Sequence, residues 1–271
     1  MKKIKSVTLA LACAAVLQYG CKKETAAEIP VDEQKESLHL KTTASGEVQT
    51  ATGGVQIMSV LFNGDASNGS ANVWKDINIE GSGTVTTVND ETGTLCWKFL
   101  KPANSHRTEG HGAENYEAQD GDEIYIGWTS KIYMPTSLKT DALFQWKSYP
   151  TAGSLQNHPL MLRTKSGNLE LQHFDDNHVA TVPWSTTLSV STWLKFVIRM
   201  KVSRNPAVGY IEFWYNGVKQ TFTNGNQRLY CRTLDVDYCD PKWGVYGGDE
   251  SQVTHFVKKI RIGTSYADAQ Q

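Results

Sequence analysis

The feature that most constrains the fold is the succession of short apolar and alternating runs in residues 55–271, which show no long helical period. Polar and apolar residues alternate in a strand with one buried face, because successive side chains point to opposite faces. Gly, Asn, Asp and Pro separate the runs, and Asn216-Gly217 predicts a tight hairpin turn. Strands are predicted at residues 55–62, 83–88, 94–99, 106–111, 123–133, 142–147, 160–164, 169–174, 194–202, 209–215, 218–222, 244–246 and 253–262.

More than ten strands in one stretch of this length predict two packed sheets. The expected fold is all-β, a jelly roll or related concanavalin A-like sandwich. Roughly 215 residues are enough for a single domain with a sizeable core. The predicted domain spans residues 55–271, and a monomer is expected.

Residues 1–20 are expected to be a signal peptide. Three lysines precede an apolar stretch at residues 7–17, which is too short to span a bilayer. The segment ends in Gly20-Cys21 and resembles a bacterial lipoprotein signal. The resemblance implies lipidation of Cys21 and anchoring to the outer membrane, on the periplasmic or the surface side. A plain secretory signal is the alternative.

Residues 21–54 contain no aromatic side chain and are rich in Lys, Glu, Thr, Ala, Ser and Gly. Such a segment cannot bury enough apolar surface to fold, so it is predicted to be a flexible tether. The net charge of the whole chain is −1, which argues against a general nucleic-acid binder.

Three cysteines remain after residue 21. Cys231 and Cys239 lie eight residues apart around a turn-like segment. In an oxidising compartment they could pair, and the alternative is two free thiols. Cys96 is expected to be a small buried residue.

Residues 105–111 carry the strongest functional signal. Arg107, Glu109 and His111 occupy alternate positions, so a strand would place a cation, a carboxylate and an imidazole on one face. This chemistry suits the binding and deprotonation of an acidic sugar. The alternative is an exposed strand face with ordinary surface charge.

Two later segments have the same character. Alternation places Gln145 and Lys147 on one face of a strand, and Lys242, Gly244 and Tyr246 on one face of another. With the strand at 123–133 and the hairpin at 209–217, these segments resemble the jelly-roll polysaccharide lyases. The heparin lyase I-like and glucuronan lyase-like groups are the most similar, and the resemblance covers roughly residues 55–265.

The resemblance implies cleavage of a uronate-containing polysaccharide by β-elimination, with no required cofactor. Arg107 and Gln145 would bind and neutralise the uronate carboxylate. Glu109 would orient Arg107, and Lys242 would contact the substrate. The chain departs from the family pattern twice. Lys147 stands where alginate lyases have a His, and Asp240 stands where many members have the catalytic Tyr.

β-Elimination needs a base for the C5 proton and an acid for the O4 leaving group. His111 or His173 could be the base, and Tyr246 the acid. Lys147 is better interpreted as a second clamp for the carboxylate, and Arg163 is placed among the substrate-binding residues.

A structural calcium ion is also predicted as an option. Asp65 and Asp268, with Asn63, could supply the oxygen ligands that hard cations prefer.

Two functions of other classes stay open at this point. One is a glycan-binding lipoprotein without catalysis, which the replacements at Lys147 and Asp240 favour. The other is a glycoside hydrolase on a similar sandwich, which needs two carboxylates across a cleft. Glu109 with Glu114, Glu117 or Glu170 could be proposed, but no motif marks a pair.

Overall fold

The protein is represented by a computed structural model that describes residues 59–149, 158–235 and 237–270. The predicted signal peptide, Cys21 and the tether lie outside the described residues. None of the helices within the described ranges is long and apolar enough to cross a membrane.

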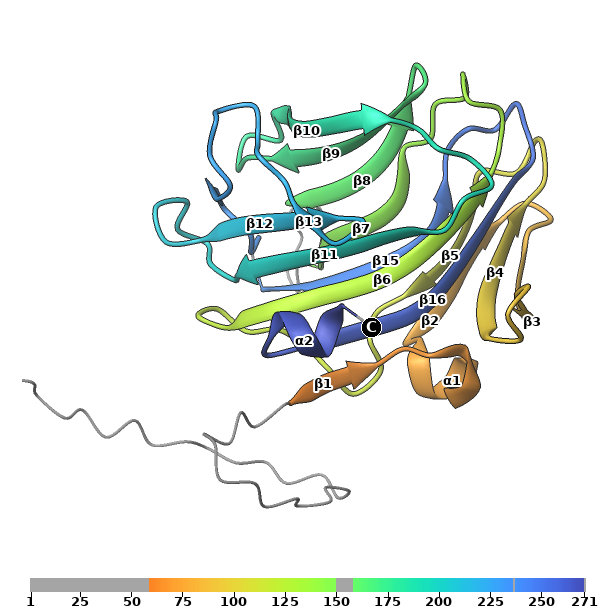
Figure 1. Cartoon of the computed structure of the whole chain (residues 1–271), viewed down its shortest axis with the longest axis horizontal. Coiled ribbons are helices and arrows are strands. Elements are labelled where there is room, and N and C mark those ends of the chain that lie inside the picture. The colour runs from red at the N-terminus through yellow and green to blue at the C-terminus, as the bar shows by residue number, and fades with distance from the viewer. Residues whose placement is uncertain (1–58, 150–157, 236, 271) are drawn as a thin grey trace, which may run out of the picture. The chain divides into compact units, whose positions relative to one another are not determined.

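Two antiparallel sheets form the fold (Figure 1). Within the described residues, the larger has nine strands, in the order β13 (Val218–Lys219), β12 (Tyr210–Tyr215), β11 (Leu194–Lys201), β6 (Glu123–Tyr133), β16 (Val253–Gly263), β4 (Leu95–Lys101) and β3 (Thr84–Asn89), with β1 (Val60–Asn63) beside β16 and β14 (Leu229–Tyr230) beside β12.

The second sheet has seven strands in the described part of the chain, in the order β10 (Ala180–Thr187), β9 (Asn168–Phe174), β8 (Leu160–Lys165), β7 (Ala142–Tyr149), β15 (Tyr238–Tyr246), β5 (Arg107–His111) and β2 (Asp76–Glu80). Three short helices complete the described structure, namely η1 (Ala66–Asn68), α1 (Ser70–Val73) and α2 (Tyr266–Ala269). The predicted jelly-roll sandwich is confirmed.

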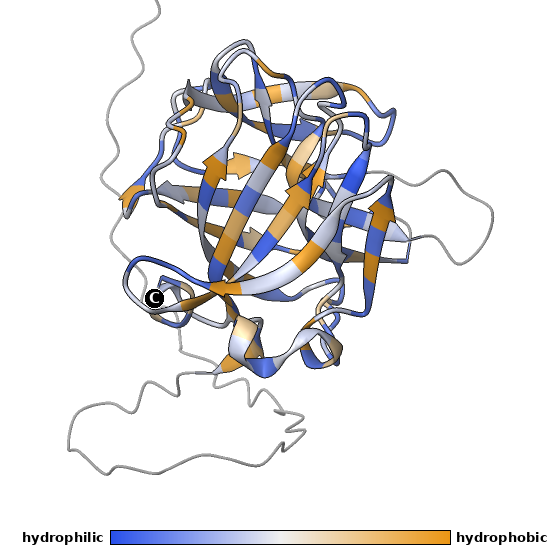
Figure 2. Ribbon diagram, turned by 90° about the vertical axis from the view of Figure 1, so that its right-hand side faces the viewer, coloured by the Kyte–Doolittle hydropathy of each residue, from blue (hydrophilic) through white to orange (hydrophobic). Residues whose placement is uncertain are grey.

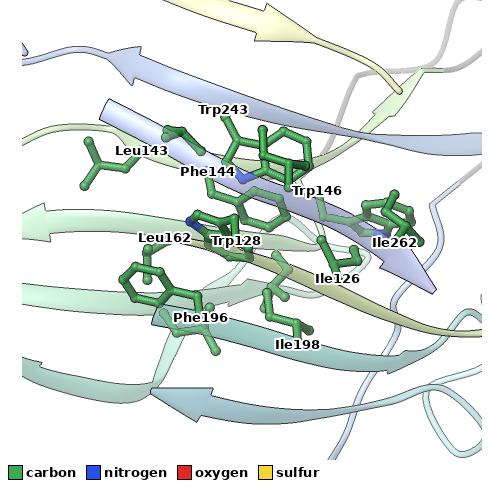
Figure 3. Packing of buried hydrophobic residues seen from close by; sticks show 14 of the residues in the cluster. Ile126, Trp128, Leu143, Phe144, Trp146, Leu162, Phe196, Ile198, Trp243 and Ile262 are labelled. Carbon is green, nitrogen blue, oxygen red and sulfur yellow. The ribbon is translucent and has the colours of Figure 1, made fainter. Parts of the chain in front are cut away.

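Aromatic side chains join the two sheets in the core. Trp128 of β6 stacks on Phe144 of β7, with 4.6 Å between ring centroids. It also meets Trp243 of β15 edge-on at 6.0 Å (Figure 3). Colouring by hydropathy shows the alternation of apolar and polar residues along the strands (Figure 2). Each sheet therefore has an apolar face for the core and a second face free for polar side chains.

The turn chemistry read from the sequence is present. Ser166 and Gly167 between β8 and β9 have φ of 52° and 80°, and Asn216 and Gly217 between β12 and β13 have φ of 50° and 81°. Positive φ at both central residues is what a type I′ hairpin requires.

Three strands were not predicted, namely β2, β10 and β14, and β15 begins six residues before the predicted segment at 244–246. Proline lacks an N–H group, so Pro241 makes the start of β15 look like a break in the sequence. The structure nevertheless pairs Pro241 with Trp146, and its carbonyl accepts a hydrogen bond from the Gly112 N–H at 2.9 Å.

The cysteines of the described residues are all free and buried. The pairing of Cys231 with Cys239, one of the two alternatives, is therefore not present. Burial raises the pKa of both thiols to about 12, so they are poor nucleophiles at neutral pH.

Candidate active site

The candidate site lies on the face of the seven-stranded sheet that points away from the core. Phe144 and Trp146 of β7 belong to the buried apolar cluster. The alternate residues Gln145 and Lys147 therefore point to the opposite face. The same alternation on β5 and β15 makes this outer face rich in polar side chains.

Strand register brings the three sequence segments together. β15 lies between β5 and β7. On the β5 side, His111 is opposite Lys242 and Arg107 is opposite Tyr246. On the β7 side, Lys242 is opposite Gln145. The residues singled out in these three segments thus share one face of three adjacent strands.

Glu109 is the centre of a buried polar cluster. Its carboxylate accepts a hydrogen bond from Gln145 Nε2 at 2.5 Å and lies 3.2 Å from Lys242 Nζ and 3.3 Å from Arg107 Nε. Lys242 also donates to Asn78 Oδ1 of β2 at 2.8 Å. Glu109, Gln145 and Lys242 are each only 1% exposed, and burial lowers the pKa of Lys242. Removing one partner of such a buried ion pair leaves the other charge buried without compensation, which strongly destabilises the fold.

Arg107 lies above this cluster and is 20% exposed. Its Nη1 is 3.3 Å from Glu80 and its Nε contacts Glu109. The guanidinium carbon sits 4.5 Å from the centroid of the Tyr246 ring. Two carboxylates and one aromatic face therefore fix the guanidinium plane, and the expected contact between Glu109 and Arg107 is present.

Gly244 allows β15 to approach β5 closely. It has a φ of 146°, and a Cβ added there would lie 2.3 Å from the Thr108 carbonyl and 2.6 Å from Glu109 Cα. No side chain fits in this space, which explains the glycine two residues after Lys242.

A second cluster surrounds His111. The ring stacks on Tyr149 of β7, with 4.6 Å between centroids and 20° between planes. His111 Nε2 is 3.7 Å from Asp240, which in turn accepts hydrogen bonds from Lys75 Nζ at 3.0 and 3.1 Å. Burial, and then the Asp240 charge, raise the pKa of Tyr149 well above its usual range. Its hydroxyl therefore stays protonated at neutral pH.

Lys147 differs from the other cations of this face. Among the described residues it has no carboxylate within ion-pair distance, and its Nζ lies 5.6 Å above the Tyr149 ring. Burial, followed by repulsion from Lys242 and Arg107, lowers the pKa of Lys147 to about 8. Glu109 and Glu80 attract this ammonium group only from beyond ion-pair distance, and they do not offset burial and the neighbouring cations. An ammonium group in such surroundings is a site for an anion.

Two predicted residues lie elsewhere. His173 is opposite Leu160, a core residue, so it points to the inner side of the sheet, and its Nε2 lies 2.9 Å from the Arg232 carbonyl. Arg163 is on the same face as Gln145, but its Nη2 is bound to Glu170 at 2.8 Å. The structure does not bring His173 together with His111.

Sequence reasoning missed Tyr149, Lys75 and Asn78. Tyr149 could have been found, because it continues the alternation of Gln145 and Lys147 along one strand. Lys75 and Asn78 carry no such signal, since only sheet pairing places β2 beside β5.

The two groups first considered as base and acid lie far apart. Tyr246 is four residues from Lys242, the residue opposite His111. At about 3.3 Å per residue, this separates Tyr246 from His111 by roughly 13 Å along the sheet. One pair cannot act on adjacent atoms of a sugar at that distance, whereas Tyr149 touches His111.

The carboxylates considered for calcium have protein partners. Asp65 forms an ion pair with Arg261, and Asp268 accepts hydrogen bonds from the Ser265 N–H at 2.9 Å and hydroxyl at 2.8 Å, as a cap of α2. The described residues contain no group of three or more His, Cys, Asp or Glu side chains that could hold a metal. The calcium site stays a prediction without structural support.

Comparison with known families decides the relationship. The model of a family described as "Polysaccharide lyase" matches residues 41–261. The chain belongs to this polysaccharide lyase family. A search of curated proteins found no sequence that matches this lyase-family chain.

Solved structures share the fold. An endo-β-1,4-glucuronan lyase from the fungus Trichoderma reesei aligns with a TM-score of 0.59 and 18% identity, over 78% of this chain and 98% of its own. The catalytic domain of a glycoside hydrolase family 131 protein from Coprinopsis cinerea aligns with a TM-score of 0.52 and 15% identity, over 78% and 97%. At these identities the neighbours show the sandwich alone, since both a lyase and a hydrolase use it.

Proposed function

We propose that this lyase-family protein cleaves a uronate-containing polysaccharide by β-elimination on the outer face of the seven-stranded sheet. The observation that carries the proposal is Lys147, a partly buried ammonium beside Lys242 and Arg107 with no described carboxylate within ion-pair distance. A uronate carboxylate is the anion that each sugar of such a polymer would supply.

Lys147 and Arg107 have complementary parts in this proposal. Deprotonation at C5 places negative charge on the neighbouring carboxylate as an enolate forms. Fixed cationic donors stabilise charge that develops in the transition state. Glu80 and Glu109 contact Nη1 and Nε of Arg107, so the Nη2 group is left for the substrate, while Lys147 supplies a point charge.

An assay for three products tests the proposal. β-Elimination yields an unsaturated sugar that absorbs ultraviolet light, hydrolysis yields reducing ends without that absorbance, and a binding protein yields neither. β-1,4-Glucuronan is the first polymer to test, because the fungal lyase with this fold acts on it. Uronate polymers with other sugars and linkages follow, with neutral glucan as control. Reducing ends without absorbance, or no product from any uronate polymer, would contradict the proposal.

The pKa of Lys147 gives a pH prediction. Its pKa of about 8 is lowered by burial and neighbouring cations, so a bound carboxylate should raise it. Binding of a uronate oligosaccharide at pH 8 should therefore take up about half a proton. Affinity should fall as the pH rises through 8, because the free protein loses the charge that binds the ligand.

Calorimetry in buffers of different ionisation enthalpy measures this uptake. Lys147→Met should abolish it and weaken binding, and Lys165→Met, at an exposed position of β8, should change neither. Equal proton uptake in the Lys147→Met variant would contradict the assignment.

We also propose that the mature protein is anchored by lipid at Cys21. The support is the lipoprotein-like order of basic, apolar and Gly-Cys segments in residues 1–21. Cys21→Ser should move the protein from the membrane fraction to the soluble fraction. A wild-type chain without lipid in mass spectrometry would contradict the anchor and leave the lyase proposal intact.

A further inference from the structure

Asp240 is a buried carboxylate that the preceding mechanism does not use. It is 1% exposed and faces the outer side of β15, between Lys75 and His111. Burying a carboxylate costs several kcal/mol unless it is paired. Lys75 supplies the pairing charge through contacts to both carboxylate oxygens. This fixes the carboxylate beside the imidazole.

The two nitrogens of His111 lie in different surroundings. Nε2 is buried, faces Asp240 at 3.7 Å, and has no hydrogen-bond partner. Nδ1 makes no hydrogen bond or ion pair in the described part of the chain, and the side chain is 16% exposed. At 3.7 Å the carboxylate makes no hydrogen bond to Nε2, but its negative charge favours an N–H dipole that points toward it. The neutral tautomer with the proton on Nε2 is therefore favoured, and Nδ1 presents its lone pair.

Tyr149 stacks on the same imidazole at 4.6 Å. Its phenol is therefore held beside the base, which Tyr246 at the other end of the face is not. Burial and the Asp240 charge keep the Tyr149 hydroxyl protonated, which is the state a proton donor needs. Asp240 itself, bound by Lys75, is not free to donate a proton.

We propose that Asp240 is a positioning residue that holds the proton of neutral His111 on Nε2, so that Nδ1 takes the C5 proton while Tyr149 protonates O4. The assignment rests on the proposed β-elimination. The C5–H electron pair forms the C4–C5 double bond as the C4–O4 bond breaks, and the phenol proton completes the new O4 hydroxyl. Proton transfer from the imidazolium to the tyrosinate restores both residues.

The first test is independent of catalysis. Nitrogen-15 NMR of labelled wild-type protein should show His111 as the Nε2–H tautomer at a pH where the ring is neutral. The Nδ1–H tautomer in the wild type would overturn the proposal, whatever the variants do. This outcome is distinct from failure of the proposed function, which would appear as no unsaturated product from any uronate polymer.

The second test uses Asp240→Asn. An amide can donate to Nε2, so the variant should shift His111 toward the Nδ1–H tautomer. It should also lower kcat by at least about 100-fold with little change in KM, because a wrong tautomer in a comparable Asp–His arrangement costs about 10⁴ in kcat. Wild-type kcat and an unchanged tautomer would overturn the positioning role.

Asp90→Asn is the matched control. Asp90 is also 1% exposed and paired with a lysine, Lys258, but it lies next to β3 of the other sheet. It should reproduce any general loss of stability while leaving kcat and the His111 signals unchanged. A similar fall in kcat in this variant would show that the Asp240 effect is structural and overturn the proposal.

Tyr149→Phe separates the acid from the base. It keeps the stacked ring and removes only the hydroxyl. It should lower kcat by about 10²–10⁴-fold and leave the His111 tautomer as in the wild type. Full activity of this variant would remove Tyr149 from the assignment.

Discussion

Replacing Glu109 by Leu should lower the free energy of unfolding by about 3–5 kcal/mol. The substitution leaves the Lys242 ammonium buried without its carboxylate, and it removes the acceptor of the Gln145 amide. Lys242 is 1% exposed and retains only the neutral Asn78 oxygen as a partner. Chemical denaturation monitored by tryptophan fluorescence measures the loss.

A double variant distinguishes charge from packing. Glu109→Leu with Lys242→Met removes both members of the buried pair, so it should recover most of the loss, since apolar replacements of buried pairs are often neutral or stabilising. Glu123→Ala breaks the more exposed pair with Arg199 and should cost less than about 1 kcal/mol. An equal loss in the single and double variants would show that the cluster matters through shape alone.

Arg107→Lys should lower kcat/KM by about 100-fold while the fold is kept. Lys retains one positive charge but cannot bridge Glu80, Glu109 and a substrate carboxylate at once, as the guanidinium fork can. A 100-fold fall in kcat/KM is about the effect of losing one preorganised donor that stabilises charge developing in the transition state. Initial rates of ultraviolet absorbance on a uronate polymer measure it.

Arg199→Lys is the control for this change, because Arg199 also bridges two carboxylates, Glu123 and Glu212, but does so on the nine-stranded sheet. Its rate should equal that of the wild type. If the protein only binds glycans, Arg107→Lys should instead weaken affinity by roughly 1–3 kcal/mol without any reaction. Unchanged rate and affinity would mean that Arg107 is an ordinary surface charge.

Periodicity explains most of what could be predicted about the strands. β6 has the bounds read from the sequence, Glu123–Tyr133, because apolar and aromatic residues dominate both ends of the run and turn residues flank it. β2 was not predicted because this edge strand contains only two apolar residues. Its outer face is polar and carries Asp76, Asn78 and Glu80. β10 contains Pro183, which weakens a strand signal at an edge.

The same alternation could have placed His173. It shares its face with Leu169 and Leu171, which belong to the core, so its inner position follows from counting by twos. Tyr149 could have been assigned to the polar face in the same way. The positions of these two residues could have been predicted from the sequence, because the face of a strand on which a side chain lies depends only on local geometry.

Contacts between side chains on different strands could not be predicted from the sequence. Lys75 and Asp240 are 165 positions apart in the chain, and their contact exists because β5 lies between β2 and β15. Neither the depressed pKa of Lys147 nor the stacking of His111 on Tyr149 follows from any local pattern. The pKa shift arises from burial and from cations on neighbouring strands. The stacking arises because the strand order places β5 and β7 on either side of β15.

The sequence by itself determined the all-β class, the main strands, the hairpin turns and the face on which Arg107, Glu109 and His111 lie, because these depend on backbone preferences and on the two-residue period of a strand. Only the tertiary structure decided the order and register of the strands. That order made Glu109 a buried partner of Lys242, separated Tyr246 from His111, and set Asp240 beside the imidazole. The reason is that hydrogen bonds and charge pairs depend on distances between segments, and no local pattern encodes these distances.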